Sequence, residues 1–309
     1  MLKEFLPEFP QNSLINFKYI HSSYNLESKM DVSILQSEDI QSGYKTKLSQ
    51  YEDLSAELNI CDLGIAKNGY FSPLVKNIVE INNEKNAIIV EFTTQTQLSE
   101  SDKQTKLVFS SNPKVKNNHN TTLAACQRHY GGFEKINNQI IGLGQIRENI
   151  QFLEPVIRKS EFLSFSMDAV KRAETQSDYS PICGLTILET CKIARYAGFS
   201  DSLKHIQIVL PVEQSDCIDE ISALFIWYFL EARSEFVKLN KKPDYIQNYI
   251  VHCESLDVDL SFIKDIQKDK WWVLNPFEED EKLPCNESDY LKILNGEDPI
   301  EFLSIFEAV

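Results

Sequence analysis

A single acid stands at the end of an apolar segment in the middle of the chain. The run Phe162–Met167 (FLSFSM) leads directly to Asp168, and the polar segment Ala169–Glu174 follows. A carboxylate at the carboxyl end of a buried strand can belong to a metal or catalytic site. It can also cap the next segment by accepting hydrogen bonds from backbone N–H groups. Isolated acids of this kind commonly cap local backbone, which favours the second role.

The histidines that could assist Asp168 have few suitable neighbours in the sequence. His119 lies in an asparagine-rich loop, and His129 stands in QRHYGG without an acid beside it. His205 and His252 lie within or beside strand patterns. A lone histidine in such settings is more often solvated, packed or hydrogen-bonded than catalytic. We therefore assign no catalytic role to any of them from the sequence.

Other residues with possible chemistry also have a simpler structural interpretation. The seven cysteines include no CxxC pair, which argues against a disulfide framework or a zinc site. Cys126 and Cys183 could be nucleophiles, but their spacing shows no Cys–His–Asn/Asp arrangement, and buried thiols are commoner. The glycine turn Gly142–Gly144 lacks a full GxGxxG phosphate motif. Trp271 and Trp272 alternate on a strand, so one is expected in the core and the other at a surface or interface.

Composition excludes several classes of protein. The chain has 309 residues, 42% of them hydrophobic, and no long segment that reads as a linker, which predicts one globular domain over residues 1–309. A formal net charge of −15 repels phosphate backbones and disfavours nucleic-acid binding. No apolar run reaches the roughly 18 residues of a membrane span. The acidic N-terminal segment does not read as a signal peptide, so we expect a cytoplasmic protein.

Short apolar runs alternate with amphipathic segments through most of the chain. This alternation predicts a mostly parallel sheet covered by helices on both faces, a three-layer α/β fold. The strand-like runs are Leu58–Cys61, Asn86–Phe92, Lys106–Ser111, Gln139–Gly144, Phe162–Met167 and His205–Pro211. The helical segments are Ser72–Ile81, Gln145–Ser160, Gly184–Gly198 and Ser215–Leu239, while Ser111–Thr122 is typical of a loop.

Three details of this pattern are specific enough to test. Pro155 should bend or shorten the helix in which it lies. Gly198 should close the helix before it, and Ser215 or Asp216 should cap the long helix that follows. Beyond residue 245, strand-like runs follow one another without helices between them. They predict an antiparallel addition at an edge of the main sheet.

Several segments of the second half carry a family resemblance. They are Leu143–Val170, Cys183–Ile206 with its RYAG turn, Ala223–Arg233, Tyr249–Leu274 and Leu283–Pro299. Together they resemble the arginase, agmatinase and formimidoylglutamase family (the ureohydrolases), and more narrowly its formimidoylglutamase-like branch from Bacteroidetes bacteria. The resemblance covers about residues 138–300 and is weak before them.

The resemblance implies a three-layer α-β-α fold, frequent oligomers and, in active members, two manganese ions. Those ions are held by aspartates and histidines at strand ends. Two adjacent cations lower the pKa of a bridging water, which becomes the hydroxide that attacks a guanidinium or formimino carbon. Hard divalent ions of this kind need several carboxylate or imidazole ligands.

A residue-by-residue transfer of the family's ligands fails at nearly every position. The segment Val90–Gln97 contains neither the expected glycines nor the histidine of the first ligand turn. The segment Ser110–Asn120 contains no aspartate where the family has Asp-x-His-x-Asp. In the third motif, Ser-Phe-Asp-x-Asp, Ser166 replaces the first aspartate, and only Asp168 remains. One carboxylate cannot hold two manganese ions, so we expect no cofactor in this chain.

Three hypotheses follow. The preferred one is a pseudoenzyme of the ureohydrolase fold that binds a protein partner or self-associates, with the apolar helix around Ile226–Phe229 as possible interface material. The second is an active amidine hydrolase whose ligands converge from substitutes; these are Asp168, Glu91, His119 and His129. The third is a metal-free small-molecule binder with a pocket at the strand ends, which plugging by Phe165 or Met167 would contradict.

Overall fold

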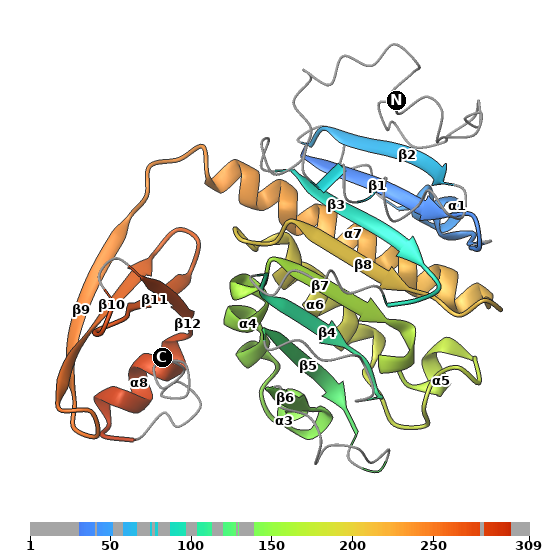
Figure 1. Cartoon of the computed structure of the whole chain (residues 1–309). Helices are drawn as coiled ribbons and strands as arrows, with labels where there is room; N and C mark the ends of the chain where they lie inside the picture. Colours follow the sequence, from blue (N-terminus) through green and yellow to red (C-terminus); the bar gives the residue numbers. More distant parts are fainter. Residues whose placement is uncertain are drawn as a thin grey trace.

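The protein is described by a computed structural model of the chain. The structure describes residues 31–40, 42–51, 58–66, 75, 78–79, 87–96, 104–112, 120–127, 129, 139–278 and 281–297. These residues build an eight-stranded sheet of order β2-β1-β3-β8-β7-β4-β5-β6 and a four-stranded sheet of order β12-β11-β10-β9 (Figure 1).

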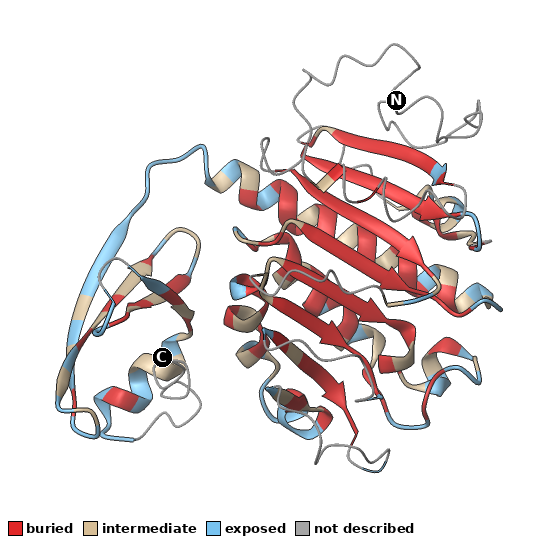
Figure 2. Ribbon diagram, viewed as in Figure 1, coloured by how far each residue is buried: buried red, intermediate tan, exposed pale blue. Residues whose placement is uncertain are grey.

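All strand pairs of the larger sheet are parallel. Its strands are nearly all buried (Figure 2), which explains why they read in the sequence as short continuous apolar runs. Their bounds are β1 Val32–Ser37, β2 Ile60–Ala66, β3 Ile88–Thr93, β4 Lys106–Phe109, β5 Thr121–Cys126, β6 Ile140–Gly142, β7 Phe162–Ser166 and β8 His205–Val209. The prediction of an α/β fold with a mostly parallel sheet is confirmed.

Helices α4 (Leu153–Lys159), α6 (Ile187–Gly198) and α7 (Asp216–Leu239) cover one face of the sheet (Figure 1). The predicted cap of α7 is confirmed, because Ser215 Oγ accepts a hydrogen bond from Ile218 N. Ile226 and Phe229 lie fully in the core, while Trp227 and Tyr228 are only partly buried against it. Among the described residues, no helix is long and apolar enough to cross a membrane.

The predicted helix Gln145–Ser160 is interrupted, as its proline suggested. It divides into α3 (Leu143–Glu148), a 3-10 turn (Ile150–Phe152) and α4. Pro155 lies in the first turn of α4, where a missing N–H costs no intrahelical hydrogen bond.

The prediction that the helix closes at Gly198 is confirmed in position. Gly198 is the last residue of α6 and Phe199 follows as the C-cap. A Cβ at Gly198 would collide with the carbonyl oxygen of Phe229 on α7. The glycine therefore permits two helices to approach closely, and it does not provide a left-handed turn.

The opposite face of the sheet has its own apolar cluster. Leu35, Cys61 and Ile89 pack there with Val75 and Ile78. The predicted helix Ser72–Ile81 lies largely outside the described residues.

Three short elements of the parallel body depart from the sequence expectation. The loop expected to run to Thr122 ends earlier, because β5 begins at Thr121. Short helices that the sequence pattern did not predict are α1 (Tyr44–Leu48) and α5 (Arg172–Thr175).

The C-terminal residues form an antiparallel sheet as predicted, but not at the edge of the parallel sheet. Strands β9 (Ile246–Cys253), β10 (Val258–Asp265), β11 (Lys270–Leu274) and β12 (Lys282–Cys285) pair only with one another among the described strands, and helix α8 (Glu287–Leu294) packs on them. They have a separate core, in which Tyr249, Trp271 and Tyr290 lie with ring centroids 5.1–5.3 Å apart. This core explains why the segment forms its own sheet. The prediction of one domain over residues 1–309 stays a prediction.

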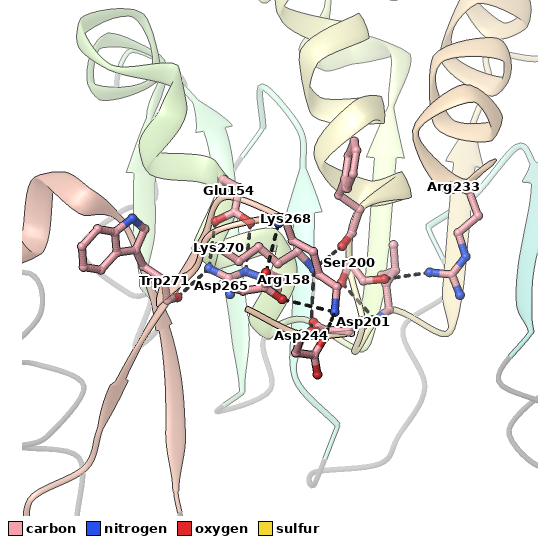
Figure 3. A network of polar contacts seen from close by, with 12 residues as sticks. Glu154, Arg158, Ser200, Asp201, Arg233, Asp244, Asp265, Lys268, Lys270 and Trp271 are labelled. Carbon is pink, nitrogen blue, oxygen red and sulfur yellow. Dashed lines mark hydrogen bonds and ion pairs between the residues drawn. The ribbon is translucent and has the colours of Figure 1, made fainter. Parts of the chain in front are cut away.

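Two buried cations join the sheets (Figure 3). Arg158 of α4 donates from Nη2 to the carbonyl oxygens of Trp271 (2.9 Å) and Cys285 (3.1 Å). Lys270 of β11 reaches back and donates to the carbonyl oxygen of Phe199 (2.6 Å). The contact is therefore reciprocal, since each body inserts one cation into the other.

Candidate functional site

Asp168 lies immediately past the carboxyl end of β7. The strand ends at Ser166, and Met167–Ala169 forms a single 3-10 turn. Ser166 caps this turn, because its Oγ accepts a long hydrogen bond of 3.4 Å from the backbone N–H of Asp168. The side-chain cap at this strand end is therefore Ser166, two residues before the aspartate.

The carboxylate of Asp168 points toward the neighbouring strand β4. Its Oδ2 accepts hydrogen bonds from Ser110 Oγ (2.8 Å) and Ser111 Oγ (3.3 Å), which follow the last residue of β4. Phe109 of β4 pairs directly with Phe165 of β7, so the ends of the two strands meet at the same edge. The interpretation of Asp168 as a cap for Ala169–Glu174 was wrong, because helix α5 has no side-chain cap.

The second carboxylate oxygen has a different environment. Asp168 Oδ1 is buried and has no hydrogen-bond partner within the described part of the chain. Burial raises the pKa of Asp168 above its ordinary value, and hydrogen bonds from Ser166, Ser110 and Ser111 oppose that rise. An unpaired buried acceptor is costly, so this oxygen is the one place in the cluster where a hydrogen-bond donor would be gained.

The nearby thiol and phenol are neutral at physiological pH. Burial, reinforced by the charge of Asp168, raises the pKa of Cys126 to about 12. A thiol with that pKa is neither a nucleophile nor a ready metal ligand. Tyr179 lies with its hydroxyl 3.2 Å from Ser166 Oγ, and burial raises its pKa as well.

These donors do not fit a pair of manganese ions. The cluster contains one carboxylate, the hydroxyls of three serines and a tyrosine, and a protonated thiol. Within the residues that the structure describes, no group of three or more His, Cys, Asp or Glu side chains could hold a metal ion. Hard divalent cations require more anionic oxygen than this set supplies.

Glu91 belongs to a different polar group in the middle of the sheet. Its Oε1 accepts a hydrogen bond of 2.5 Å from Gln207 Nε2, and Ser164 Oγ donates to Gln207 Oε1 (3.2 Å). These three residues pair directly across β3, β8 and β7. His205 Nε2 also approaches Glu91 Oε1, at 3.1 Å but without hydrogen-bond geometry.

Among the described residues, the side chains proposed as substitute metal ligands in the active-hydrolase hypothesis therefore do not lie together. Glu91 lies level with Ser164, four residues before Asp168, and each acid has its own set of polar neighbours. His129 is exposed, and His119 lies outside the described residues.

The remaining residues singled out from the sequence have structural surroundings. Phe165 and Met167 are fully buried in the core shared with the helices. His252 is exposed and pairs with Asp259 (3.0 Å). Cys183 is exposed, and its backbone carbonyl oxygen accepts a hydrogen bond from the side chain of Gln127. Its thiol has no nucleophilic arrangement in the contacts that the structure describes.

The tryptophan pair divides as the alternation on a strand predicted. Trp271 is buried in the C-terminal core. The ring of Trp272 lies on the other face of β11, with the Arg158 guanidinium 4.7 Å from its centroid. It is the interface residue of the two.

The most informative site residues, Ser110 and Ser111, were missed from the sequence. Serine is an unremarkable residue after a strand, and no motif marks these two. Their role depends on β4 and β7 being neighbours, although more than fifty residues separate them in the chain. Only the strand order, had it been known, could have revealed the contact.

Comparison with known proteins supports the fold. No protein-family model matches the sequence, and a search of curated proteins gave no match. Among solved structures, formiminoglutamase from Trypanosoma cruzi crystallised with Mn²⁺ is similar with a TM-score of 0.56 and 13% identity, over 69% of this chain and 96% of that chain. Agmatine ureohydrolase of Thermoplasma volcanium is similar with a TM-score of 0.51 and 16% identity, over 68% and 92%.

A hypothetical agmatinase from Burkholderia thailandensis is also similar, with a TM-score of 0.50 and 12% identity over 67% of this chain and 87% of that chain. The chain therefore has the fold of arginase-superfamily ureohydrolases. At such low identity this similarity establishes the fold alone.

Proposed function

We propose that this chain is a divergent, non-catalytic protein of the ureohydrolase fold that acts by binding a protein partner or by assembling with itself. The proposal places it near the formimidoylglutamase-like branch of Bacteroidetes bacteria because of the segments in its second half, such as Leu143–Val170. We also propose that the protein is cytoplasmic, since all seven cysteines are free thiols, as expected in a reducing compartment.

The hydroxyl cluster around Asp168 carries the proposal. At the strand ends where the resemblance expects acids and histidines, the described residues are Ser110, Ser111 and Ser166. Serine hydroxyls stabilise one carboxylate by donating to it, but they add no negative charge for a cation. The edge of the sheet is thus organised around a single carboxylate and neutral donors.

Metal analysis combined with an activity assay tests the proposal. Purified protein exchanged into excess Mn²⁺ and then desalted should retain far less than two ions per chain. It should not hydrolyse formimidoylglutamate, agmatine or arginine. Two retained ions per chain together with amidine hydrolysis would overturn the proposal and favour the active-hydrolase alternative.

A second candidate function rests on Asp168 Oδ1. This oxygen is buried and lacks a partner among the described residues, so a small molecule that donates a hydrogen bond could satisfy it. Such a metal-free binder would stabilise the protein in a thermal-shift screen of small amines and amides, and Asp168→Asn would remove that stabilisation. A screen without any hit that depends on Asp168 would eliminate this candidate.

A further inference from the structure

The outer strand of the C-terminal sheet is unusual for a free sheet edge. β9 forms the outer border of the molecule in Figure 1 and is largely pale blue, hence exposed, in Figure 2. Natural edge strands avoid pairing with other chains by being short or bulged, or by carrying charges or proline. β9 is eight residues long (IQNYIVHC), has no Asp, Glu, Lys, Arg or Pro, and pairs with β10 in an unbroken register.

The opposite edge of the same sheet shows the usual protection. β12 has only four residues, and these include Lys282 and Pro284. Arg158 of α4 also donates to the carbonyl oxygen of Cys285 there. The same sheet therefore has one protected edge and one open edge.

The backbone of β9 is oriented to accept another strand. Tyr245 O accepts a hydrogen bond from Ile266 N, so Tyr245 directs its polar backbone groups toward β10. Because these groups alternate along an antiparallel strand, those of Ile246, Asn248, Ile250 and His252 point away from β10. No described strand pairs with β9 on that side.

Two of these residues, Ile246 and Ile250, leave an apolar surface in water. Tyr249 and Val251 turn toward the core of the C-terminal sheet. Ile250 is 72% exposed and Ile246 is 49% exposed on the other face. Exposed isoleucines on a neutral edge strand are an association surface.

We propose that β9 pairs antiparallel with β9 of a second copy of this chain, joining two four-stranded sheets into one continuous sheet about a two-fold axis. The proposed register places Asn248 opposite Asn248 of the other copy. Each Ile246 then faces an Ile250 across the axis, on the same side of the sheet. The inference gives the assembly part of the proposed function a surface, and it depends on that function only for its biological role.

Charge favours a second copy as the occupant. Two chains of net charge −15 repel each other over most of their surface, so self-association needs a neutral contact, and β9 is one. The same register directs Glu254 toward Lys242 of the other copy, and two-fold symmetry makes this opposite-charge pair occur twice.

Measurement of the molar mass in solution tests the pairing. Sedimentation equilibrium of the full chain should give twice the 35.6 kDa of the monomer. Ile250→Lys should raise the dissociation constant of the dimer at least about tenfold, because it introduces a charge at the apolar pair. The matched control is Leu188→Lys, since Leu188 is equally exposed (77%) but lies on α6.

The inference is overturned if the wild-type chain is a monomer. It is also overturned if the dimer of Ile250→Lys has the same dissociation constant as the dimer of Leu188→Lys. If the monomer captures another protein's strand through β9, the occupant proposed here is wrong. Circular dichroism confirms that each variant is folded. Failure of the dimer would leave the metal test of the proposed function unaffected, so the two can fail separately.

Engineered cysteines test the register in a Cys183→Ser background, which removes the exposed native thiol. Directly opposed residues of a hydrogen-bonded antiparallel pair have Cα atoms about 5.5 Å apart, within disulfide range. Asn248→Cys should therefore form a covalent dimer under mild oxidation. Gln247→Cys should not form a covalent dimer, because Gln247 faces Tyr249 of the other copy in this register. Equal or faster cross-linking of Gln247→Cys would contradict the proposed register.

Discussion

Two buried polar regions of the molecule stabilise their charged side chains in different ways. At the interface between the sheets, each cation meets an anion. Arg158 Nε lies 2.9 Å from Glu154 Oε1, and Lys270 Nζ lies 3.7 Å from Asp201 Oδ2 (Figure 3). At the carboxyl end of the parallel sheet, Asp168 has neutral hydroxyls and one unpaired oxygen.

The difference separates charges that join two parts of the fold from an isolated buried acid. Paired ions that also bind backbone carbonyls join two bodies. Removal of one ion leaves its counter-ion, or a carbonyl oxygen, buried in a low dielectric without a partner. A lone acid among hydroxyls joins only the ends of β4 and β7. We therefore expect large losses of stability from substitutions at the interface and smaller, chemically specific effects near Asp168.

The largest effect is expected from Arg158→Met. The substitution leaves the carbonyl oxygens of Trp271 and Cys285 without this donor and removes the partner of Glu154. Breaking a buried ion pair of this type costs about 3–5 kcal/mol of unfolding free energy. Chemical denaturation at neutral pH measures the loss.

The control for this prediction is Arg195→Met. Arg195 also pairs with glutamates, but its side chain is 38% exposed. Solvent-exposed pairs contribute about 0–1 kcal/mol. Equal losses at the two arginines would show that the interface network is no more important than a surface ion pair.

The next largest effect concerns Ser166→Asp, which restores the acid expected from the family motif. Ser166 is 3% exposed and its Oγ bonds Asp168 N, so a second carboxylate would lie beside the first in a buried place. We expect a loss of about 3 kcal/mol at neutral pH, since buried like charges are costly. Ser166→Asn, similar in size but neutral, should lose less.

Addition of manganese further distinguishes Ser166→Asp from Ser166→Asn and the wild type. With two carboxylates present, Mn²⁺ should raise the melting temperature of the Ser166→Asp variant but of neither the wild type nor Ser166→Asn. Thermal shift with and without MnCl₂ measures it. Equal stabilisation of the wild type would mean that Asp168 already holds a metal in the native chain, contrary to the proposed function.

The contribution of Lys270 to the free energy of unfolding depends on pH in the alkaline range. Burial, opposed in part by Asp201, lowers the pKa of Lys270 to about 8 from an ordinary value of 10.5. Between these two values the unfolded chain binds the proton and the folded chain has lost it. Unfolding free energy attributable to this group therefore rises with pH across that window. Well below pH 8 both states are protonated and the contribution is constant.

The measurement is the difference in unfolding free energy between the wild type and Lys270→Met as a function of pH. From pH 8 to pH 10 the wild type should gain about 2 kcal/mol relative to the variant. Other groups that titrate in this range cancel in the difference. A difference that stays flat or falls with pH would show that Lys270 is not held in a desolvating environment.

The sequence predicted the parallel body well because its strands and helices have local signals. Buried strands such as Phe162–Met167 are continuous apolar runs, and the long helix to Leu239 carries its own cap at Ser215. The separate C-terminal sheet was recognised as strands, but its placement depends on an aromatic core assembled from Tyr249, Trp271 and Tyr290. Such packing has no local signal.

The site was harder to predict than the fold. Asp168 was identified by its position after a strand, yet its hydrogen-bond partners come from β4, at a distance in sequence that no spacing rule covers. Glu91 was identified as a substitute ligand from its residue type alone. The register instead places it beside Gln207, with His205 nearby.

The smallest expected effect distinguishes the two hydroxyls that bind Asp168. Ser110 Oγ lies 2.8 Å from Oδ2 and Ser111 Oγ lies 3.3 Å from it. A hydrogen bond to a charged group contributes about 1.5–3 kcal/mol, but the carboxylate here keeps one donor when the other is removed. We therefore expect Ser110→Ala to cost about 1 kcal/mol and Ser111→Ala less.

A titration of Asp168 separates this role from simple packing. Loss of a donor to the carboxylate disfavours its charged form, so Ser110→Ala should raise the pKa of Asp168 further, and NMR of the side-chain carboxyl carbon would report it. Ser222→Ala is the matched control, because that buried serine donates to the Ile218 carbonyl oxygen within α7. If both variants leave the pKa of Asp168 unchanged, the serines at the end of β4 pack beside the acid without holding its charge, and the contrast with the interface disappears.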